Sequence, residues 1–537
     1  MPPHIRLPLA ARLCKPIVQI LPRLQPVGRR QLSLRQPRDL GGQIALELPH
    51  APQKQTPLQQ HQRRIAATAH QRRRLGQSRC FCRAQPNKRM PVRQSGKQAR
   101  HIRHGRRRGT LSLPLAAFAA DTQPTHEFTL DNGLKVIVRE DHRAPVVVSQ
   151  IWYKVGSSYE TPGQTGLSHA LEHMMFKGTP KVPSGEFSRR VAALGGQNNA
   201  YTNRHETVYF ETVAAANLPE VLKMEADRMA NLNFSNQDFA NEMSVIREER
   251  RQRTEDSPGG KLWEQLYLSS FQTDANRAPI IGYMADLHAL KAADLRRWYR
   301  RWYAPNNAVL VIVGDVDAAQ TLRTVQQLFG PIQARALPER QNLAEPQVRA
   351  PARAETRAVT HQPLLALGYR VPALEKLDDT LPYALDVLAD ILSGNSASRL
   401  DKNLVRGKEA ALDVGASYDM FSRGPALFTL VAMPADRTDV AQLQKLLEAE
   451  IADIARHGIS NEELARVHTR MAASEIYARD SMSAQASLMG QLQTRGFSYR
   501  DEAELRRRLQ SVDAAQVQAA ARLLTPERQT VVVVQPE

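Results

Sequence analysis

His169, Glu172 and His173 are the residues of this chain whose types and spacing point most directly to chemistry. Two histidines four residues apart lie on one face of a helix, where both imidazoles can bind the same metal ion. Glu172 lies beside both and is placed to act on a metal-bound water. A single histidine is more often a packed or solvated residue, but this combination favours a metal site.

The segment that carries these residues, TGLSHALEHMMFKGT over residues 165–179, is expected to form one helix that ends at Gly178 and Pro180. The order His-x-x-Glu-His is the reverse of the usual zinc-protease motif and is the inverzincin signature. On the side of the helix opposite the histidines, an apolar stripe at helical spacing consists of Leu167, Leu171 and Met174.

A later helix is predicted over residues 236–254, and its carboxylates differ in the side to which they point. At about 100° per residue, Glu242 and Glu249 lie on one flank of this helix's apolar stripe, whereas Glu248 points to the opposite side. Glu249 can therefore face a neighbouring helix, and Glu248 faces solvent. The stripe itself consists of Phe239, Met243 and Ile246.

The positive charge of the chain is confined to its N-terminal fifth. The 537 residues carry a net charge of +19, but residues 1–108 alone hold 25 Lys and Arg against Asp39 and Glu47. The remainder has 48 basic and 52 acidic residues, so the basic balance says nothing about the folded part. All cysteines lie in the same fifth, which excludes a disulfide or a thiolate metal site in residues 109–537.

Residues 1–108 are rich in Arg, Gln and Pro and show no sustained helical or strand period, so we predict a disordered basic extension. One interpretation is a basic arm that binds nucleic acid or a membrane surface. The other is that the start of translation has been assigned too far upstream, so that this segment is not part of the protein. We favour the second interpretation and expect no nucleic-acid partner. The chain has no apolar run of 18 residues, so we also expect no membrane span.

Residues 109–119 resemble a secretory signal peptide. We favour a start assigned too far upstream because such a signal normally stands at the beginning of a chain. Arg106, Arg107 and Arg108 precede a short apolar run, and Ala117 and Ala119 offer small residues for cleavage before Ala120. We therefore expect an exported, periplasmic protein, with a cytoplasmic location as the alternative.

From residue 121 onward, strand and helix patterns alternate in two runs. We predict an α+β fold of two homologous halves, each an antiparallel-rich sheet packed with helices. The halves are expected at residues 121–335, which carry the metal site, and 355–537, with a Pro- and Arg-rich linker at residues 336–354. A hairpin turn is predicted at residues 131–133 in the first half and another at residues 422–425 in the second.

The two halves look like diverged copies. Phe234-Ser235-Asn236 opens a long helix, and Ile459-Ser460-Asn461 recurs at a corresponding place. The second half has no His-x-x-Glu-His, so only the first half can hold this metal.

Residues 197–213 are predicted to form two strands, the first polar and the second rich in β-branched and aromatic residues. A polar strand is typical of a sheet edge, and an edge can accept an added peptide strand. The first strand contains Asn199, Ala200, Tyr201 and Thr202.

Over residues 125–537 the sequence resembles the pitrilysin-like zinc peptidases, the family of insulysin, mitochondrial processing peptidase and their bacterial relatives. The resemblance rests on the His-x-x-Glu-His motif, on Glu242 and Glu249, on Asn199-Ala200-Tyr201-Thr202 and on the paired halves. It implies a zinc endopeptidase for peptides or unfolded segments, with one Zn²⁺ per chain bound by His169, His173 and Glu249. It also implies that Glu172 is the general base, Glu242 a supporting carboxylate and the polar strand the substrate-binding edge.

The sequence departs from the family pattern at one place. The family uses an Arg and a Tyr seven residues apart to hold the substrate carbonyl, and here Arg406 is a possible substrate contact but Asp413 stands where the Tyr would be. We therefore expect the catalytic subunit of a two-subunit peptidase, whose homologous partner supplies the Arg and Tyr. The alternative is a non-catalytic assembly or scaffold subunit of the same fold.

Overall fold

The computed structural model describes residues 123–339, 345–346 and 351–537. The predicted basic extension and the signal-like segment therefore lie outside the described residues. Within these ranges, no helix is both long enough and apolar enough to cross a bilayer.

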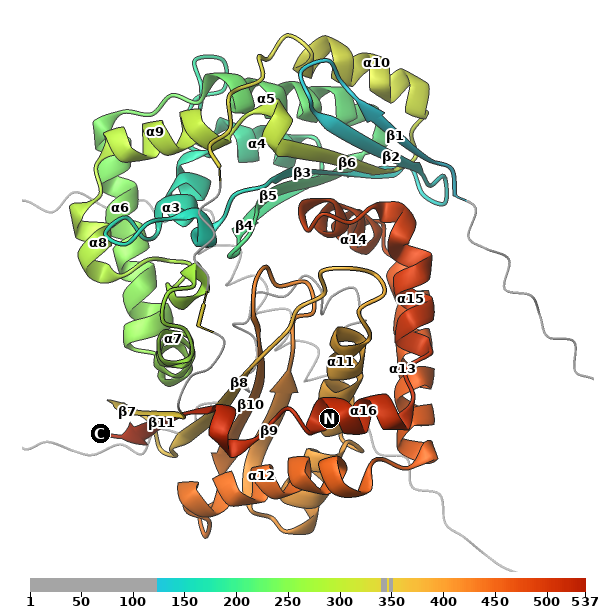
Figure 1. Cartoon of the computed structure of the whole chain (residues 1–537). Helices are drawn as coiled ribbons and strands as arrows, with labels where there is room; N and C mark the ends of the chain where they lie inside the picture. The colour runs from blue at the N-terminus through green and yellow to red at the C-terminus, as the bar shows by residue number, and fades with distance from the viewer. Residues whose placement is uncertain (1–122, 340–344, 347–350) are drawn as a thin grey trace, which may run out of the picture. The chain divides into compact units, whose positions relative to one another are not determined.

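The first half is built on a six-stranded sheet in the order β1-β2-β6-β3-β5-β4 (Figure 1). Neighbouring strands are antiparallel except β2 and β6, which are parallel. The predicted turn at residues 131–133 joins β1 to β2, and Gly133 takes a φ of 83° there. The strands are β1 (Thr125–Thr129), β2 (Lys135–Glu140), β3 (Val146–Tyr153), β4 (Gln197–Thr202), β5 (Thr207–Ala214) and β6 (Ala308–Gly314).

The second half is built on a five-stranded sheet in the order β7-β11-β8-β10-β9. Here β7 and β11 are parallel and the other neighbours antiparallel. The first strand begins inside the predicted linker of residues 336–354. The strands are β7 (Ala352–Ala358), β8 (Leu364–Val371), β9 (Ala411–Ser417), β10 (Ala426–Pro434) and β11 (Gln529–Pro536).

The two sheets share one topology once β1 is set aside. In each, the last strand in sequence runs parallel to the first and antiparallel to the second, and the hairpin of the third and fourth strands completes the other edge. The long helices α6 and α13 also begin alike, with capping boxes at Ser235 and Ser460. The predicted α+β fold of two homologous, antiparallel-rich halves is confirmed.

Helices cover both sheets. Those of the first half are α3 (Leu167–Met174), α4 (Glu186–Ala193), α5 (Leu218–Asn231), α6 (Asn236–Arg250), the π-helical turn η3 (Arg251–Glu255), α7 (Pro258–Ser270), α8 (Met284–Ala289), α9 (Ala292–Trp302) and α10 (Ala318–Phe329). Those of the second half are α11 (Thr380–Ser393), the π-helical turn η6 (Asp401–Gly407), α12 (Val440–His457), α13 (Asn461–Asp480), α14 (Met482–Thr494), α15 (Glu502–Gln510) and α16 (Ala514–Ala521).

Two helices differ from the sequence prediction. α3 is shorter than the predicted helix over residues 165–179, because the chain turns after Met174 and Gly178, at a φ of 99°, forms a bridge with Pro183. α7 was not predicted, since its sequence opens with Pro258-Gly259-Gly260 and reads as a loop.

The first sheet is buried on both faces, and its strand β6 is buried along its whole length. Leu310 and Ile312 point into the core shared with the helices of the first half. Val309, Val311 and Val313 point to the other face, which is covered by α14 from the second half. Figure 1 shows α14 lying against this sheet.

α14 and α7 make a reciprocal exchange between the halves. Ala486 and Met489 of α14 join the apolar cluster on the first sheet, and Gly490 lies so close to Trp152 of β3 that a Cβ there would overlap the indole ring. In return, α7 packs Leu262 and Leu266 on the second sheet, against residues of β8, β10 and β11. Each sheet is therefore completed by a helix from the opposite half.

Candidate metal centre

A buried carboxylate fixes the amino-terminal end of α3. Gly166, the N-cap residue, has a left-handed φ of 90°, and Glu160 accepts hydrogen bonds from the backbone N–H groups of Gly166 and Ser168, both at 2.7 Å. Burial raises the pKa of Glu160 to about 8, although these two donors oppose the shift. These hydrogen bonds hold the first turn of α3 in place, and the position of this turn determines where the side chains of His169 and His173 point.

His169 and His173 meet Glu249 of α6 at a common point. Oε2 of Glu249 lies 3.8 Å from Nε2 of His169 and 3.5 Å from Nε2 of His173. The three ligand atoms lie within 4.8 Å of one another. A tetrahedral zinc centre with bonds of about 2.0–2.1 Å separates its ligand atoms by about 3.3–3.5 Å, so this donor set fits one such ion.

The electrostatics of the two imidazoles differ. Burial, helped by the neighbouring His173, holds the pKa of His169 well below its usual value, so His169 is neutral and keeps a lone pair for a metal. Burial also opposes protonation of His173, but its hydrogen bond to Glu242 and the nearby carboxylates raise the pKa of His173.

Glu242 lies directly behind His173. Its Oε1 is 2.9 Å from Nδ1 of His173, and its other oxygen contacts Nζ of Lys177. The hydrogen bond from His173 is the largest cause that lowers the pKa of Glu242. A carboxylate in this position fixes the ring orientation and leaves Nε2 free for a metal.

Glu172 lies beside the histidines and is tied to the sheet. The hydroxyl of Thr202 donates a 2.6 Å hydrogen bond to Oε2 of Glu172, and burial raises the pKa of this carboxyl. Thr202 is the last residue of β4, and β4 is the edge strand of the first sheet. The structure thus brings together the predicted general base and the predicted edge strand of Asn199 to Thr202.

The two remaining positions lie in the second half, outside the ligand cluster. Arg406 is exposed in η6, where its guanidinium donates to the carbonyl oxygen of Ser396. Asp413 lies in β9, opposite Met433 of β10. A contact between Arg406 and substrate stays a prediction.

Three partners of the centre were missed by sequence reasoning. Arg253 lies four residues after the candidate ligand Glu249, and this helical spacing would have pointed to it. Lys177 lies beyond the end of α3 and contacts Glu242 of α6, so local spacing could not reveal it. Glu160 has no such local signal, because its contact depends on the loop that returns to α3.

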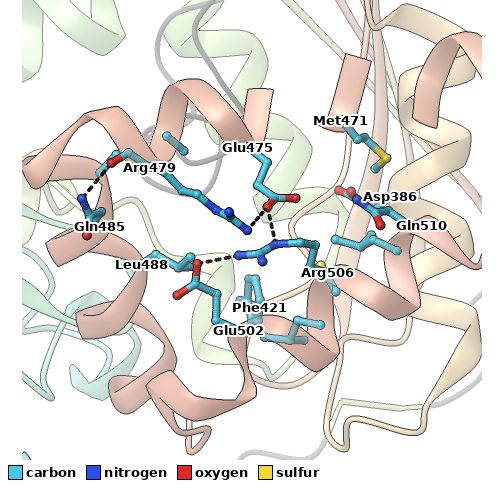
Figure 2. A pocket seen from close by; sticks show the side chains of 15 residues that line it. Asp386, Phe421, Met471, Glu475, Arg479, Gln485, Leu488, Glu502, Arg506 and Gln510 are labelled. Carbon is cyan, nitrogen blue, oxygen red and sulfur yellow. Dashed lines mark hydrogen bonds and ion pairs between the residues drawn. The ribbon is translucent and has the colours of Figure 1, made fainter. Parts of the chain in front are cut away.

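A separate cavity of about 90 Å³ lies among α13, α14 and α15 in the second half. Figure 2 shows Glu475 between the guanidinium groups of Arg479 and Arg506, with Glu502 also on Arg506. Much of the wall is apolar and includes Phe421, Met471, Leu488, Leu505 and Leu509. None of the candidate metal ligands lines this cavity, so it is not part of the metal centre.

Comparison with known proteins identifies the family. The family model described as Insulinase (Peptidase family M16) matches residues 135–282, and the one described as Peptidase M16 inactive domain matches residues 289–471. The chain is 31% identical over 391 residues to the zinc protease PqqE of Helicobacter pylori, covering 70% of this chain and 85% of that protein. It is 25% identical to the uncharacterized zinc protease YmxG of Bacillus subtilis, covering 76% and 98%.

Solved structures agree. A protease from Helicobacter pylori superposes with a TM-score of 0.73 at 27% identity, covering 77% of this chain and all of that one. The periplasmic protease PqqL from Escherichia coli has the same fold, with a TM-score of 0.64 at 21% identity, and the match covers 48% of its length. The chain belongs to peptidase family M16, the pitrilysin-like peptidases, and its curated relatives bear the name zinc protease.

Proposed function

We propose that this chain is a zinc-dependent endopeptidase that hydrolyses peptides or unfolded segments. The observation that carries the proposal is the convergence of His169, His173 and Glu249 on one point with Glu172 beside it. The names of the relatives support the same reaction class.

His169, His173 and Glu249 would hold the zinc ion, which supplies Lewis acidity and lowers the pKa of water towards about 7. Glu172 takes a proton from the attacking water and returns one to the leaving amine. The Thr202 hydroxyl orients this carboxylate. Glu242 holds His173 in the tautomer with a free Nε2.

The substrate is an extended peptide that adds to the edge of the first sheet. β4 presents its main chain there, and its last residue contacts Glu172. Main-chain hydrogen bonding selects extended segments with little regard to side chains, which suits unfolded polypeptides.

A homologous subunit completes the site by supplying the Arg and Tyr. Asp413 in place of the Tyr supports this part of the proposal, as does the length of PqqL, about twice that matched by this chain. Export to the periplasm is part of the same proposal and is supported by the signal-like segment of residues 109–119.

The test is zinc content and cleavage of a mixed library of unstructured peptides, by the full chain with and without a homologous partner. The control variant is Glu172→Gln. We expect the wild type and Glu172→Gln each to bind one zinc ion per chain. The wild type with its partner should cleave peptides, whereas the variant, or the wild type after chelation of the zinc, should not. Cleavage by Glu172→Gln at the wild-type rate would remove Glu172 as the base. A wild-type chain that binds no zinc and cleaves no peptide would favour the alternative, a non-catalytic scaffold subunit.

A further inference from the structure

We propose that Arg253 is a positioning residue for the metal centre, which holds Glu249 in the orientation that points one oxygen at the histidines. The inference rests on the proposed function, because it assigns a role towards the zinc ligand Glu249. Arg253 lies in η3, the π-helical turn that follows α6.

The two carboxylate oxygens of Glu249 face different partners. Oε2 faces the imidazoles of His169 and His173, at 3.8 and 3.5 Å. Oε1 points the other way and lies 2.7 Å from Nη1 of Arg253. A guanidinium on the second oxygen fixes the side-chain torsion and offsets part of the negative charge, as outer partners of metal ligands commonly do.

The backbone that carries Arg253 is locked in place. The π-helical hydrogen bond runs from the N–H of Asp256 to the carbonyl oxygen of Arg251, at 2.7 Å. Arg250, at the start of the turn, is buried and bonds Glu264 of α7 through both terminal nitrogens, at 2.6 and 2.9 Å. π-helical turns inside helices occur frequently at functional sites.

α7 packs on the same turn from outside. A Cβ at Gly260 would overlap the carbonyl oxygen of Arg253 and lie 2.6 Å from the Cα of Thr254. The same helix is anchored in the second sheet by Leu262 and Leu266. The position of Arg253, and with it the orientation of Glu249, therefore depends on a helix held by the other half of the chain.

A neighbouring pair offers a matched control. Arg251 pairs with Glu248 at 2.8 Å, on the same turn and with the same charges. Both arginine side chains are largely solvent-exposed, 64% for Arg253 and 48% for Arg251, so exposed ion pairing alone predicts little effect for either. The two pairs differ at the glutamate: Glu249 is 16% exposed and faces the histidines, whereas Glu248 is 54% exposed.

The experiment compares Arg253→Gln, Arg253→Lys and Arg251→Gln in the full chain. Zinc affinity is measured by competition with a chromophoric chelator, and the ligand geometry is followed by the visible absorption of the Co²⁺-substituted protein. We expect Arg253→Gln to weaken zinc binding about 10- to 100-fold and to change the Co²⁺ spectrum. Arg253→Lys should recover part of both, and Arg251→Gln should match the wild type.

The outcomes distinguish failure of the proposed role of Arg253 from failure of the proposed zinc-peptidase function. Wild-type zinc affinity and an unchanged Co²⁺ spectrum in Arg253→Gln would overturn the role of Arg253 and leave the proposed function intact. Equal losses in Arg253→Gln and Arg251→Gln would also overturn it, because the effect would then be general to the turn. A wild-type chain that binds neither Zn²⁺ nor Co²⁺ would overturn both proposals.

Discussion

The hydroxyl of Thr202, in the edge strand, donates a 2.6 Å hydrogen bond to the carboxylate of Glu172, which lies 30 positions earlier in the sequence, in α3. This contact joins the residue proposed to move the proton to the strand proposed to hold the substrate. An incoming peptide would lie against β4, so its scissile bond would be placed relative to Glu172 by the same strand.

Replacing Thr202 by Val removes the hydroxyl while keeping the β-branched shape. Because a hydrogen bond to a charged group contributes about 1.5–3 kcal/mol, we expect kcat to fall about 10- to 100-fold while the zinc content stays the same. Steady-state cleavage of a peptide substrate measures the change. Thr202→Ser should restore much of the rate, and an equal loss in both variants would argue against the hydroxyl.

Glu242→Gln weakens the support of His173. The amide retains an acceptor but not the charge, so the ring orientation is held less firmly and zinc affinity should fall about tenfold or more. Chelator competition measures the affinity. Glu248→Gln, on the solvent side of the same helix, serves as the control and should leave the affinity unchanged. Indistinguishable affinities of the two variants would contradict a supporting role for Glu242.

Gly490→Ala tests the packing of α14 on the first sheet. The added methyl group would overlap the indole of Trp152, so we expect the free energy of unfolding to fall by about 1–3 kcal/mol. The denaturation midpoint measures this change. Ser483→Ala, at an exposed position of the same helix, should have little effect. A Gly490→Ala chain as stable as the wild type would show that α14 can move away from Trp152.

Asp141→Asn tests an acid-sensitive carboxylate that lies where α14 packs on the first half. Asp141 accepts hydrogen bonds from Arg143 at 2.6 and 2.8 Å and from Gln485 of α14 at 3.3 Å. The hydrogen bonds from Arg143 lower the pKa of Asp141 to about 2, against an ordinary value of about 3.9. A carboxyl with a lowered pKa stabilises the fold above its ordinary pKa, and this contribution is lost as the pH falls towards about 2.

The wild type should therefore exceed Asp141→Asn in stability near neutral pH, and the difference should shrink as the pH falls below about 4. Denaturant unfolding at pH 6, 4 and 3 measures it. A difference that is constant across this range would mean that the charge of Asp141 contributes nothing.

Helical periodicity was enough to predict which side chains face the centre, whereas the ligand role of Glu249 came from the family resemblance. The angular argument that placed Glu249 towards a neighbouring helix and Glu248 in solvent agrees with their positions beside His173 and Arg251. It worked because both residues lie on one regular helix, where about 100° per residue fixes the face. The edge position of β4 followed in the same way from its polar residues.

Contacts that depend on the sheet register or on the other half could not be predicted locally. Thr202 was assigned to the substrate strand, but its bond to Glu172 requires β4 to lie beside α3. α7 was missed because Gly259 and Gly260 are poor helix formers, and the helix is stabilised by burying Leu262 and Leu266 on the second sheet, whose strands lie far along the chain, within residues 352–536.

Because α7 and α14 each pack on the sheet of the opposite half, the two halves should stay together even when the chain between them is cut. A proteolytic nick between β7 and α10 would leave two pieces, each with a bare apolar sheet face and each still holding the helix that fits the other's face. Such pieces should stay associated after cleavage and should reassemble when expressed from separate genes. The two helices, together with contacts such as Arg500 to Glu127 and Arg423 to Tyr159, would then hold the halves together without a continuous chain.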